Sequence, residues 1–354
     1  MTPVQGHLEI MDKGYGFLRN IDQNYTPDAT DTYVSNHLIK KYRLREGSFI
    51  AGSGAKKNPN NKNFALTAIE TINSLSFDEF SKTTILQDQI SINPFERFQL
   101  TQDSTDTMGK ALDMIIPIGM GQRGLIISPP KSGKTTILRH MANSVLTNHS
   151  DTDVFVLLVD ERPEEVTDFQ RGLKGAQVLF SSSDQQIAQH MRMTRLAMHS
   201  AICCAEAGRN AVIFIDSLTR MTRAFNSETQ SHGRTMTGGL GINAMEIPRK
   251  IFGAARKVEN GGSLTIIATI LIDTGSRMDD IIYQEFKGTG NMDLVLSREC
   301  AEHRVWPAIN IHQSGTRKEA LLMDQDEYDK IISIRREVAE LDEVSAMSRL
   351  IELI

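Results

Sequence analysis

Cysteine is scarce in this chain of 354 residues, and the three that occur stand at positions 203, 204 and 300. No C-x-x-C pair is present, and the neighbouring Cys203 and Cys204 are poorly placed to bridge two parts of a fold. These features argue against a disulfide-stapled secreted scaffold. We therefore expect a protein of a reduced compartment, and read it as cytosolic (cytoplasmic).

Long apolar runs and a strong charge excess are absent as well. No stretch of about 18 uncharged apolar residues occurs, and the N-terminus lacks a basic start followed by an apolar run, so no membrane association is expected. The formal net charge is −5, so the molecule as a whole is no polycation. Any nucleic-acid site must therefore be local.

What the sequence does contain changes character along the chain. Residues 4–73 predict short strands separated by turns, residues 74–100 form a transition without a clear period, and strands alternate with helices from about residue 101. Such alternation predicts an α/β domain with a parallel sheet. We therefore expect a small all-β domain over 1–73, a linker over 74–100 and an α/β domain over 101–354.

Apolar runs and helical periods place the elements of this α/β domain. Buried parallel strands are expected at 124–128, 154–160, 211–216 and 264–271. Helices are expected at 134–147, 163–173, 184–207 and 242–257, and two more over about 326–354. Pro163 suits the first turn of its helix, and Gly208 stands where a helix C-cap is expected.

A phosphate-binding loop is predicted at residues 128–135, which read SPPKSGKT. The loop follows an apolar strand and opens a helix, which is the context that the P-loop motif requires. Backbone N–H groups would hold the phosphates, Lys134 would lie on the β- and γ-phosphates, and the Thr135 hydroxyl would bind Mg²⁺. Ser128 replaces the first glycine of the general motif, and we expect this small residue to permit the turn.

Two carboxylates directly follow other predicted buried strands. Asp216 ends one of them, and a carboxylate there is costly unless it is paired or metal-bound. We interpret it as the acid on the Mg²⁺ side, with an N-cap for the next helix as the alternative. Glu161 follows the strand at 154–160 and is the candidate that orients and deprotonates the attacking water.

An aromatic pair stands out in the segment 7–19. If the segment were one strand, Tyr15 and Phe17 would share its solvent face with Lys13 and Arg19. Exposed rings flanked by cations suit single-stranded nucleic acid, because bases stack on the rings and cations attract the backbone. Residue parity alone leaves open the alternative that another strand or domain covers the pair. Tyr33 could supply a third ring.

Seven segments taken together are far more specific than a phosphate-binding loop. They are GYGFLR at 14–19, PPKSGKT at 129–135, DERPEEVT at 160–167, FGAAR at 252–256, DTGS at 273–276, FKGTGN at 286–291 and SGTRK at 314–318. Their combination resembles the bacterial transcription termination factor Rho family from about residue 5 to the C-terminus. The resemblance implies a homohexameric ring of subunits, each with an OB-fold, cold-shock-like RNA-binding domain and a RecA-like P-loop NTPase domain.

The resemblance also implies roles at a nucleotide site between subunits. Glu161 would activate water, Lys134 and Asp216 would act on phosphate and Mg²⁺, and Arg317 would be an arginine finger for the neighbouring subunit. Trp306, the sole tryptophan, is included only because of the resemblance, since a lone tryptophan is more often a core residue than a ligand contact. The residues implied to bind ATP and Mg²⁺ are Pro130, Lys131, Ser132, Gly133, Lys134, Thr135, Thr136, Arg162, Arg304 and Trp306, with Thr135 and Asp216 on the metal.

Two RNA sites are implied in the same way. The N-terminal site would comprise Tyr15, Phe17, Arg19, Asp31, Tyr33 and Phe64, and two loops of the central pore would contribute Arg234, Thr235, Thr237, Gly275 and Arg277. The chain departs from the family at Arg234 and Arg277, where lysine is common, and at Asn63, where an aromatic residue often stands. We expect no counterpart here of the helical extension that many members carry before the OB-fold.

The leading hypothesis is therefore an RNA-dependent ATPase and 5′→3′ RNA translocase that terminates transcription. Its partners would be single-stranded nascent RNA, five further copies of the chain, RNA polymerase and elongation factors. One alternative is an RNA-binding ring protein in which ATP binding is only regulatory. Another is a RecA-like rotary ATPase subunit or DNA motor, which the aromatic face at 14–19 disfavours.

Overall fold

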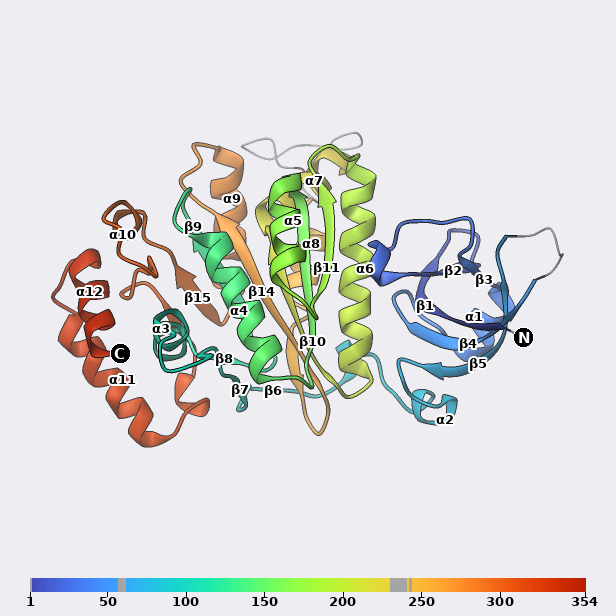
Figure 1. The fold of residues 1–354 in the computed structure, drawn as a ribbon, viewed down its shortest axis with the longest axis horizontal. Helices are drawn as coiled ribbons and strands as arrows, with labels where there is room; N and C mark the ends of the chain where they lie inside the picture. The colour runs from blue at the N-terminus through green and yellow to red at the C-terminus, as the bar shows by residue number, and fades with distance from the viewer. Residues whose placement is uncertain (1, 57–61, 230–240, 242–243) are drawn as a thin grey trace.

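The computed structural model describes residues 2–56, 62–229, 241 and 244–354. A small barrel carries the N-terminus at one end of the molecule, and the C-terminal helices lie at the other, with a large sheet between them (Figure 1). Among the described residues, no helix has both the length and the apolar character needed to cross a membrane.

The barrel is built from the first part of the chain and contains α1 (Asn36–Tyr42) beside its strands. Its strands pair in the order β1-β2-β3-β5-β4, and β4 closes on β1. This closed order confirms the predicted OB-fold. The strands are β1 (Thr2–Ile10), β2 (Gly16–Arg19), β3 (Thr32–Val34), β4 (Phe49–Ala55) and β5 (Ala65–Ile72).

The interpretation of 7–19 as one strand is wrong, because the chain reverses between β1 and β2. The N–H of Met11 donates to the carbonyl of Tyr15 at 2.8 Å, and that of Gly14 to the carbonyl of Met11 at 2.7 Å. Gly14 has φ of +80°, and a Cβ there would lie 2.3 Å from the side-chain amide nitrogen of Asn36. Both conditions require glycine at this turn.

The segment expected to be a linker contains short elements. A capping box between Ser76 and Glu79 opens α2 (Phe77–Phe80), where the two side chains satisfy each other's backbone N–H groups. A 3₁₀ turn (Leu86–Asp88), β6 (Ser91–Ile92) and β7 (Arg97–Phe98) follow. Because β6 pairs with β13 (Arg256–Val258), the segment is anchored on the large sheet before the α/β part begins.

The large sheet has the order β11-β10-β12-β14-β9-β15-β16, with β13 and β6 beside β14. Along the order from β11 to β15, each strand runs parallel to the next. The carboxyl ends of these strands therefore meet at one edge of the sheet, at the top of Figure 1. Its remaining strands are β9 (Arg123–Ser128), β10 (Asp153–Glu161), β11 (Gln177–Ser182), β12 (Asn210–Asp216), β14 (Ser263–Leu271), β15 (Met292–Val295) and β16 (Gly315–Thr316). The short β8 (Ile118–Gly119) pairs with β7 in a separate sheet.

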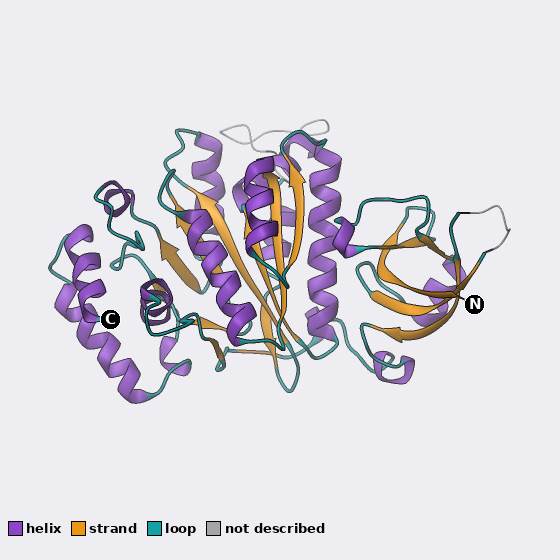
Figure 2. Ribbon diagram, in the orientation of Figure 1, coloured by secondary structure: helices purple, strands orange, loops and turns teal. Residues whose placement is uncertain are grey.

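Helices cover both faces of this sheet, as a parallel sheet requires (Figure 2). Side chains of α3, α4 and α5 pack with the C-terminal helices in one core, and those of α6 to α9 form a second core on the opposite face. The helices are α3 (Thr107–Ile115), α4 (Lys134–Asn148), α5 (Pro163–Gly172), α6 (Ile187–Glu206), α7 (Leu218–Thr229), α8 (Glu246–Phe252), α9 (Arg277–Phe286), α10 (Arg298–Glu302), α11 (Gln325–Val338) and α12 (Glu343–Leu353).

The predicted strands and most predicted helices are confirmed to within a few residues. The helix expected at 242–257 is the exception, because α8 ends at Phe252 and the chain continues into β13. Lys257 pairs with Ser263 across the β13–β14 hairpin and with Ile92 of β6, and these ladder hydrogen bonds override the local helical pattern. The boundaries 73 and 100 between domains stay a prediction.

Candidate nucleotide and RNA sites

The predicted phosphate-binding loop lies at the carboxyl end of β9, directly before α4. Gly133 is the N-cap of α4 and has φ of +86°, and Lys131 has φ of +65°. Left-handed residues of this kind turn the chain sharply before α4, and the first N–H groups of a helix have no partner within the helix. A loop of this shape at a helix N-terminus binds phosphate.

Ser128 fits the turn for a reason that the sequence did not reveal. Its side chain is buried, and its hydroxyl lies 3.0 Å from the hydroxyl of Ser132 and 3.0 Å from the carbonyl of Pro129. The Ser132 hydroxyl in turn donates to the Pro129 carbonyl at 2.8 Å. Ser128 therefore fastens the loop from below, a contact that glycine could not make.

Lys134 lies between two buried carboxylates. Its Nζ is 2.5 Å from Oδ1 of Asp216 and 3.9 Å from Oε2 of Glu161. Asp216 is 0% exposed and Glu161 is 1% exposed, and both end parallel strands at the same sheet edge. The Thr269 hydroxyl also donates to Oδ1 of Asp216 at 2.8 Å. The structure therefore brings together the three residues that the sequence placed at one catalytic site.

Two oxygens of this cluster are left for a further partner. Within the described residues, neither Oδ2 of Asp216 nor Oε2 of Glu161 has a hydrogen-bond partner, although both are buried. Buried carboxylate oxygens without partners are costly, and a divalent cation with its water ligands would satisfy them. The Thr135 hydroxyl, which donates to Glu165 at 3.4 Å, lies on the first turn of α4. The residues present thus fit a nucleotide with Mg²⁺.

Within the described residues, protein side chains alone form no metal centre. In the part of the chain that the structure describes, no group of three or more His, Cys, Asp and Glu side chains could hold a metal ion. Phosphate oxygens would have to complete the coordination at Asp216 and Thr135, as they do for Mg²⁺ in P-loop NTPases.

Glu161 has the electrostatics of a general base. Burial raises the pKa of its carboxyl above the ordinary value, and the Asp216 carboxylate raises it further, while Lys134 and Arg220 oppose both effects. A raised pKa strengthens the proton affinity of the carboxylate, so that it accepts a proton from water more readily.

The sequence interpretation missed Arg220, which reaches Glu161 from α7. Its Nη2 is 3.3 Å from Oε1 of Glu161, and its Nη1 donates to the carbonyl of Asp160 at 2.5 Å. Arg220 thus pairs with Oε1 of the candidate base, whereas Lys134 lies nearer to Oε2. The available signal was that α7 follows Asp216 directly, which places its first turn at the same sheet edge.

Trp306 lies beside the phosphate-binding loop rather than in the core. A Cβ on Gly133 would lie only 2.6 Å from Cζ3 of the indole, and 41% of the Trp306 residue is exposed. The ring is therefore available to stack on a base next to the loop. Two further implied nucleotide contacts, Arg162 and Arg304, are both exposed, and Arg304 has φ of +61°.

Arg317 lies at the opposite end of the sheet from its own phosphate-binding loop. Its N–H donates to the carbonyl of Asn291, whose own N–H donates to the carbonyl of Arg123 at the start of β9. The loop begins at Ser128, roughly 17 Å further along that strand at about 3.3 Å per residue. Arg317 is exposed and cannot join the Lys134 site of the same chain.

On the barrel, three rings gather as expected. Their centroids are 5.8 Å apart for Tyr15 and Phe17, 5.6 Å for Tyr15 and Tyr33, and 6.0 Å for Phe17 and Tyr33. We call these three rings the stacking face. All three are partly exposed, which decides against the alternative that another strand or domain of the chain covers them. The N–H of Tyr33 donates to the carbonyl of Phe64, so Phe64 adjoins this face.

Arg19 is not on a solvent face, and that expectation is wrong. It is 5% exposed, and its guanidinium forms ion pairs with Glu9, at 2.6 Å from Nε, and with Asp31. The same guanidinium lies 4.9 Å from the centroid of Phe17, in a cation–π contact. Arg19 and Asp31 therefore adjoin the stacking face, but as a mutually neutralised pair.

The predicted pore segments are described in part. Gly275 has φ of +76° with open space around its Cα, and Arg277 is exposed at the start of α9. The segment is fastened from behind, because the Thr274 hydroxyl donates to Asp279 at 2.6 Å. Arg234, Thr235 and Thr237 lie outside the described residues.

Comparison with protein families matches the two parts of the chain separately. Residues 4–78 match the Rho termination factor RNA-binding domain. Residues 109–316 match the nucleotide-binding domain of the ATP synthase alpha/beta family.

Curated relatives match over almost the whole chain. A transcription termination factor Rho from Rhodopirellula baltica is 45% identical over 351 residues, covering 98% of this chain and 68% of that protein. The Rho factor of Aquifex aeolicus is 45% identical over 358 residues, covering 99% of this chain and 81% of that protein. The Rho factor of Pseudomonas aeruginosa is 43% identical and is covered over 83% of its length.

Solved structures with the same fold include ATPases of type III secretion systems. A prototypical ATPase of that system from pathogenic bacteria superposes with a TM-score of 0.61 at 23% identity, over 80% of this chain and 77% of that chain. The assembled ATPase EscN from enteropathogenic E. coli gives 0.58 at 22% identity, over 82% and 68%. At this identity the likeness concerns the fold alone.

Proposed function

The chain belongs to the transcription termination factor Rho family, and from this membership we propose that it hydrolyses ATP to move along single-stranded RNA and terminate transcription. One observation carries the proposal. A single chain holds both the buried cluster of Lys134, Asp216 and Glu161 and the stacking face on the barrel. An ATP-driven RNA motor needs these two sites together.

The roles of the residues at the nucleotide follow from their positions. Backbone N–H groups of the loop and Lys134 would hold the phosphates, and Thr135 and Asp216 would hold Mg²⁺, which when bound supplies charge neutralisation at the phosphate oxygens. Lys134 would pair with phosphate in place of Asp216, whose carboxylate would then be free to hold the cation. Glu161 orients the attacking water and accepts its proton, with Arg220 holding its other oxygen in place.

The position of Arg317 explains why the chain would act as a ring of several copies. Since Arg317 cannot reach its own loop, it serves the nucleotide of a neighbouring copy, and a closed ring of six copies completes every pocket. Hydrolysis then changes which subunits hold the strand at Arg277 and the other pore residues, and differential affinity becomes movement. The movement is 5′→3′, the substrate is the nascent transcript in the cytoplasm, and RNA polymerase with its elongation factors is the target.

The function is tested by ATP hydrolysis with and without single-stranded RNA, beside native mass measurement. Stimulation by polycytidylate, weaker stimulation by single-stranded DNA and a mass of six subunits are expected. Nucleotide binding without RNA-stimulated turnover would favour the alternative of a ring in which ATP is only regulatory. Equal stimulation by DNA would favour a DNA motor.

Removal of one ring tests the RNA site separately. We expect Phe17→Ala to weaken binding of a short pyrimidine RNA by about 1–3 kcal/mol, or roughly 5- to 150-fold. The substitution removes a ring on which a base can stack, together with the cation–π contact that the ring makes with Arg19. Fluorescence anisotropy without nucleotide measures this affinity. Phe77→Ala, which removes an exposed ring of α2 outside the stacking face, is the matched control. Equal affinities of the two variants would contradict the assignment.

A further inference from the structure

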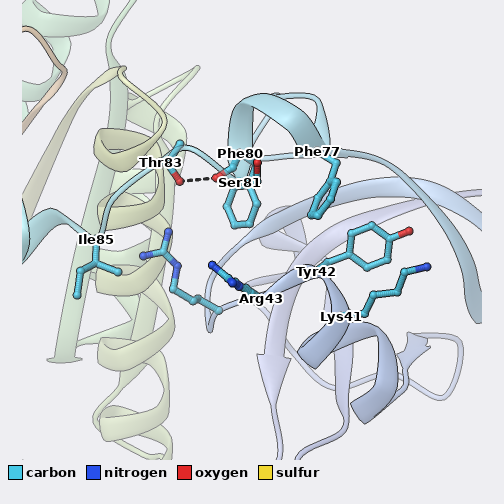
Figure 3. A pocket seen from close by; sticks show the side chains of 9 residues that line it. Lys41, Tyr42, Arg43, Phe77, Phe80, Ser81, Thr83 and Ile85 are labelled. Carbon is cyan, nitrogen blue, oxygen red and sulfur yellow. Dashed lines mark hydrogen bonds between the residues drawn. The ribbon is translucent and has the colours of Figure 1, made fainter.

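The barrel is docked along most of the length of one helix, α6 of the ATPase domain. Near one end Arg192 contacts the barrel, in the middle Ser200 lies 2.8 Å from the hydroxyl of Tyr25, and at the other end Glu206 pairs with Arg45 at 2.7 Å. The outer two contacts are about 21 Å apart along the helix axis. Arg45 also lines a hollow of about 460 Å³, together with residues of α1 and of the segment 77–85 (Figure 3).

The contact at Arg192 differs from the other two because it reaches the stacking face. Nε and Nη2 of Arg192 donate to the two oxygens of Glu9 at 2.5 and 2.8 Å, and Nη2 also donates to the carbonyl of Tyr25 at 2.7 Å. Glu9 accepts from Arg19 at the same time, at 2.6 Å. One carboxylate therefore joins a guanidinium of the ATPase domain to the guanidinium that supports Phe17.

Strand register places Glu9 in line with the rings. Glu9 is the direct partner of Phe17 across β1 and β2, and Phe17 is the direct partner of Tyr33 across β2 and β3. Direct partners in a ladder project from the same face of a sheet. Glu9, Phe17 and Tyr33 thus form a row across three strands, and Arg192 contacts the end of that row from another domain.

The charges in this row balance only when Arg192 is present. Arg19 and Arg192 carry two positive charges, and Glu9 and Asp31 carry two negative charges, all within direct contact. Although burial opposes it, hydrogen bonds from Arg192 and then Arg19 hold the pKa of Glu9 below its ordinary value. Without Arg192, an ionised Glu9 would leave one net negative charge beside a face that must accept the phosphates of RNA.

We infer that Arg192 is a positioning residue of the RNA site: by neutralising Glu9 and holding it against Arg19, the ATPase domain completes the RNA-binding face of the barrel. The inference rests on the proposed function of that face. Arg192 touches no RNA itself, and acts through Glu9 and Arg19 on the orientation and the local charge of the stacking face.

The test measures the affinity of the full chain for a fluorescent oligocytidylate by anisotropy, without nucleotide. Arg192→Gln is expected to weaken binding roughly tenfold, while Arg192→Lys, which keeps the charge but not the paired contact, should lie in between. Arg195→Gln is the matched control, because Arg195 lies one helical turn away, is 61% exposed and is 3.9 Å from Glu46. It should bind RNA as the unsubstituted chain does.

A rescue variant separates charge from damage to the fold. Adding Glu9→Gln to Arg192→Gln removes the excess negative charge, so the double variant should regain a large part of the lost RNA affinity. Arg45→Gln loosens the barrel at the far end of α6 without touching Glu9, and should leave RNA affinity near that of the unsubstituted chain.

Three outcomes would overturn the inference: unchanged RNA affinity in Arg192→Gln, an equal loss in Arg45→Gln, or no recovery in the double variant. Nucleotide affinity at the Lys134 site should be the same in all variants, which verifies that the ATPase domain is intact. Absence of RNA binding by the unsubstituted chain is a different result, because it would refute the proposed function as well.

Discussion

Lys134→Ala abolishes ATP hydrolysis while single-stranded RNA still binds to the stacking face. Turnover should fall by at least about 10²-fold, because the lysine is the cation between the phosphates and the two buried carboxylates. RNA affinity should stay within about twofold, since the Lys134 cluster and the stacking face belong to different domains. Phosphate release and RNA anisotropy on the same preparation measure the two quantities.

A second variant guards against a change in the fold. Among the described residues, removing Lys134 leaves Thr269 as the hydrogen-bond partner of the buried Asp216 carboxylate, and the loss of its cation partner destabilises the domain. Glu161→Gln keeps Lys134 and the shape of the site but removes the base, so it should lose turnover while nucleotide still binds. Joint loss of RNA binding and hydrolysis in both variants would argue against two separable sites.

Arg317→Ala should reduce turnover by about 10³-fold or more with nucleotide still bound, the range expected for an arginine finger. Because Arg317 is exposed and lies at the far end of β9, its removal leaves the cluster at Lys134 untouched. Arg298→Ala is the control, since this arginine is 62% exposed and its pair with Glu302 lies on the surface.

Mixing adds a prediction about the ring. Subunits that carry Arg317→Ala should poison rings that also contain unsubstituted subunits, so activity should fall faster than the fraction of unsubstituted chain. A fall in direct proportion to dilution would count against cooperation between neighbouring subunits.

Local signals were sufficient to predict the nucleotide half of the site. The apolar strands end at Ser128, Glu161 and Asp216, and because parallel strands share a carboxyl edge, their terminal residues had to meet. The glycine, lysine and threonine of the loop are read directly from the sequence. The roles of Arg220 and Thr269 were not predicted, because the contact of Arg220 depends on the direction of α7 and that of Thr269 on the neighbouring strand β14.

Long-range contacts explain what the sequence could not predict. Residue parity placed Phe17 on the correct face, but the burial of Arg19 depends on Asp31 and on Glu9, which is itself held by Arg192 from a distant part of the chain. In the same way, the helix expected at 242–257 is cut short by pairing of β13 with β14 and β6. In both places partners remote in sequence outweigh the local pattern.

The most direct test of the shared pocket joins its two walls with a cross-link. In a chain carrying Lys131→Cys and Arg317→Cys, both positions are exposed, whereas the natural cysteines at 203, 204 and 300 are buried. With RNA and nucleotide present, a short thiol cross-linker should give a denaturing-gel ladder from two up to six covalently joined chains, and neither single variant should do so. A doubly substituted chain that stays a single subunit on the gel would contradict the account.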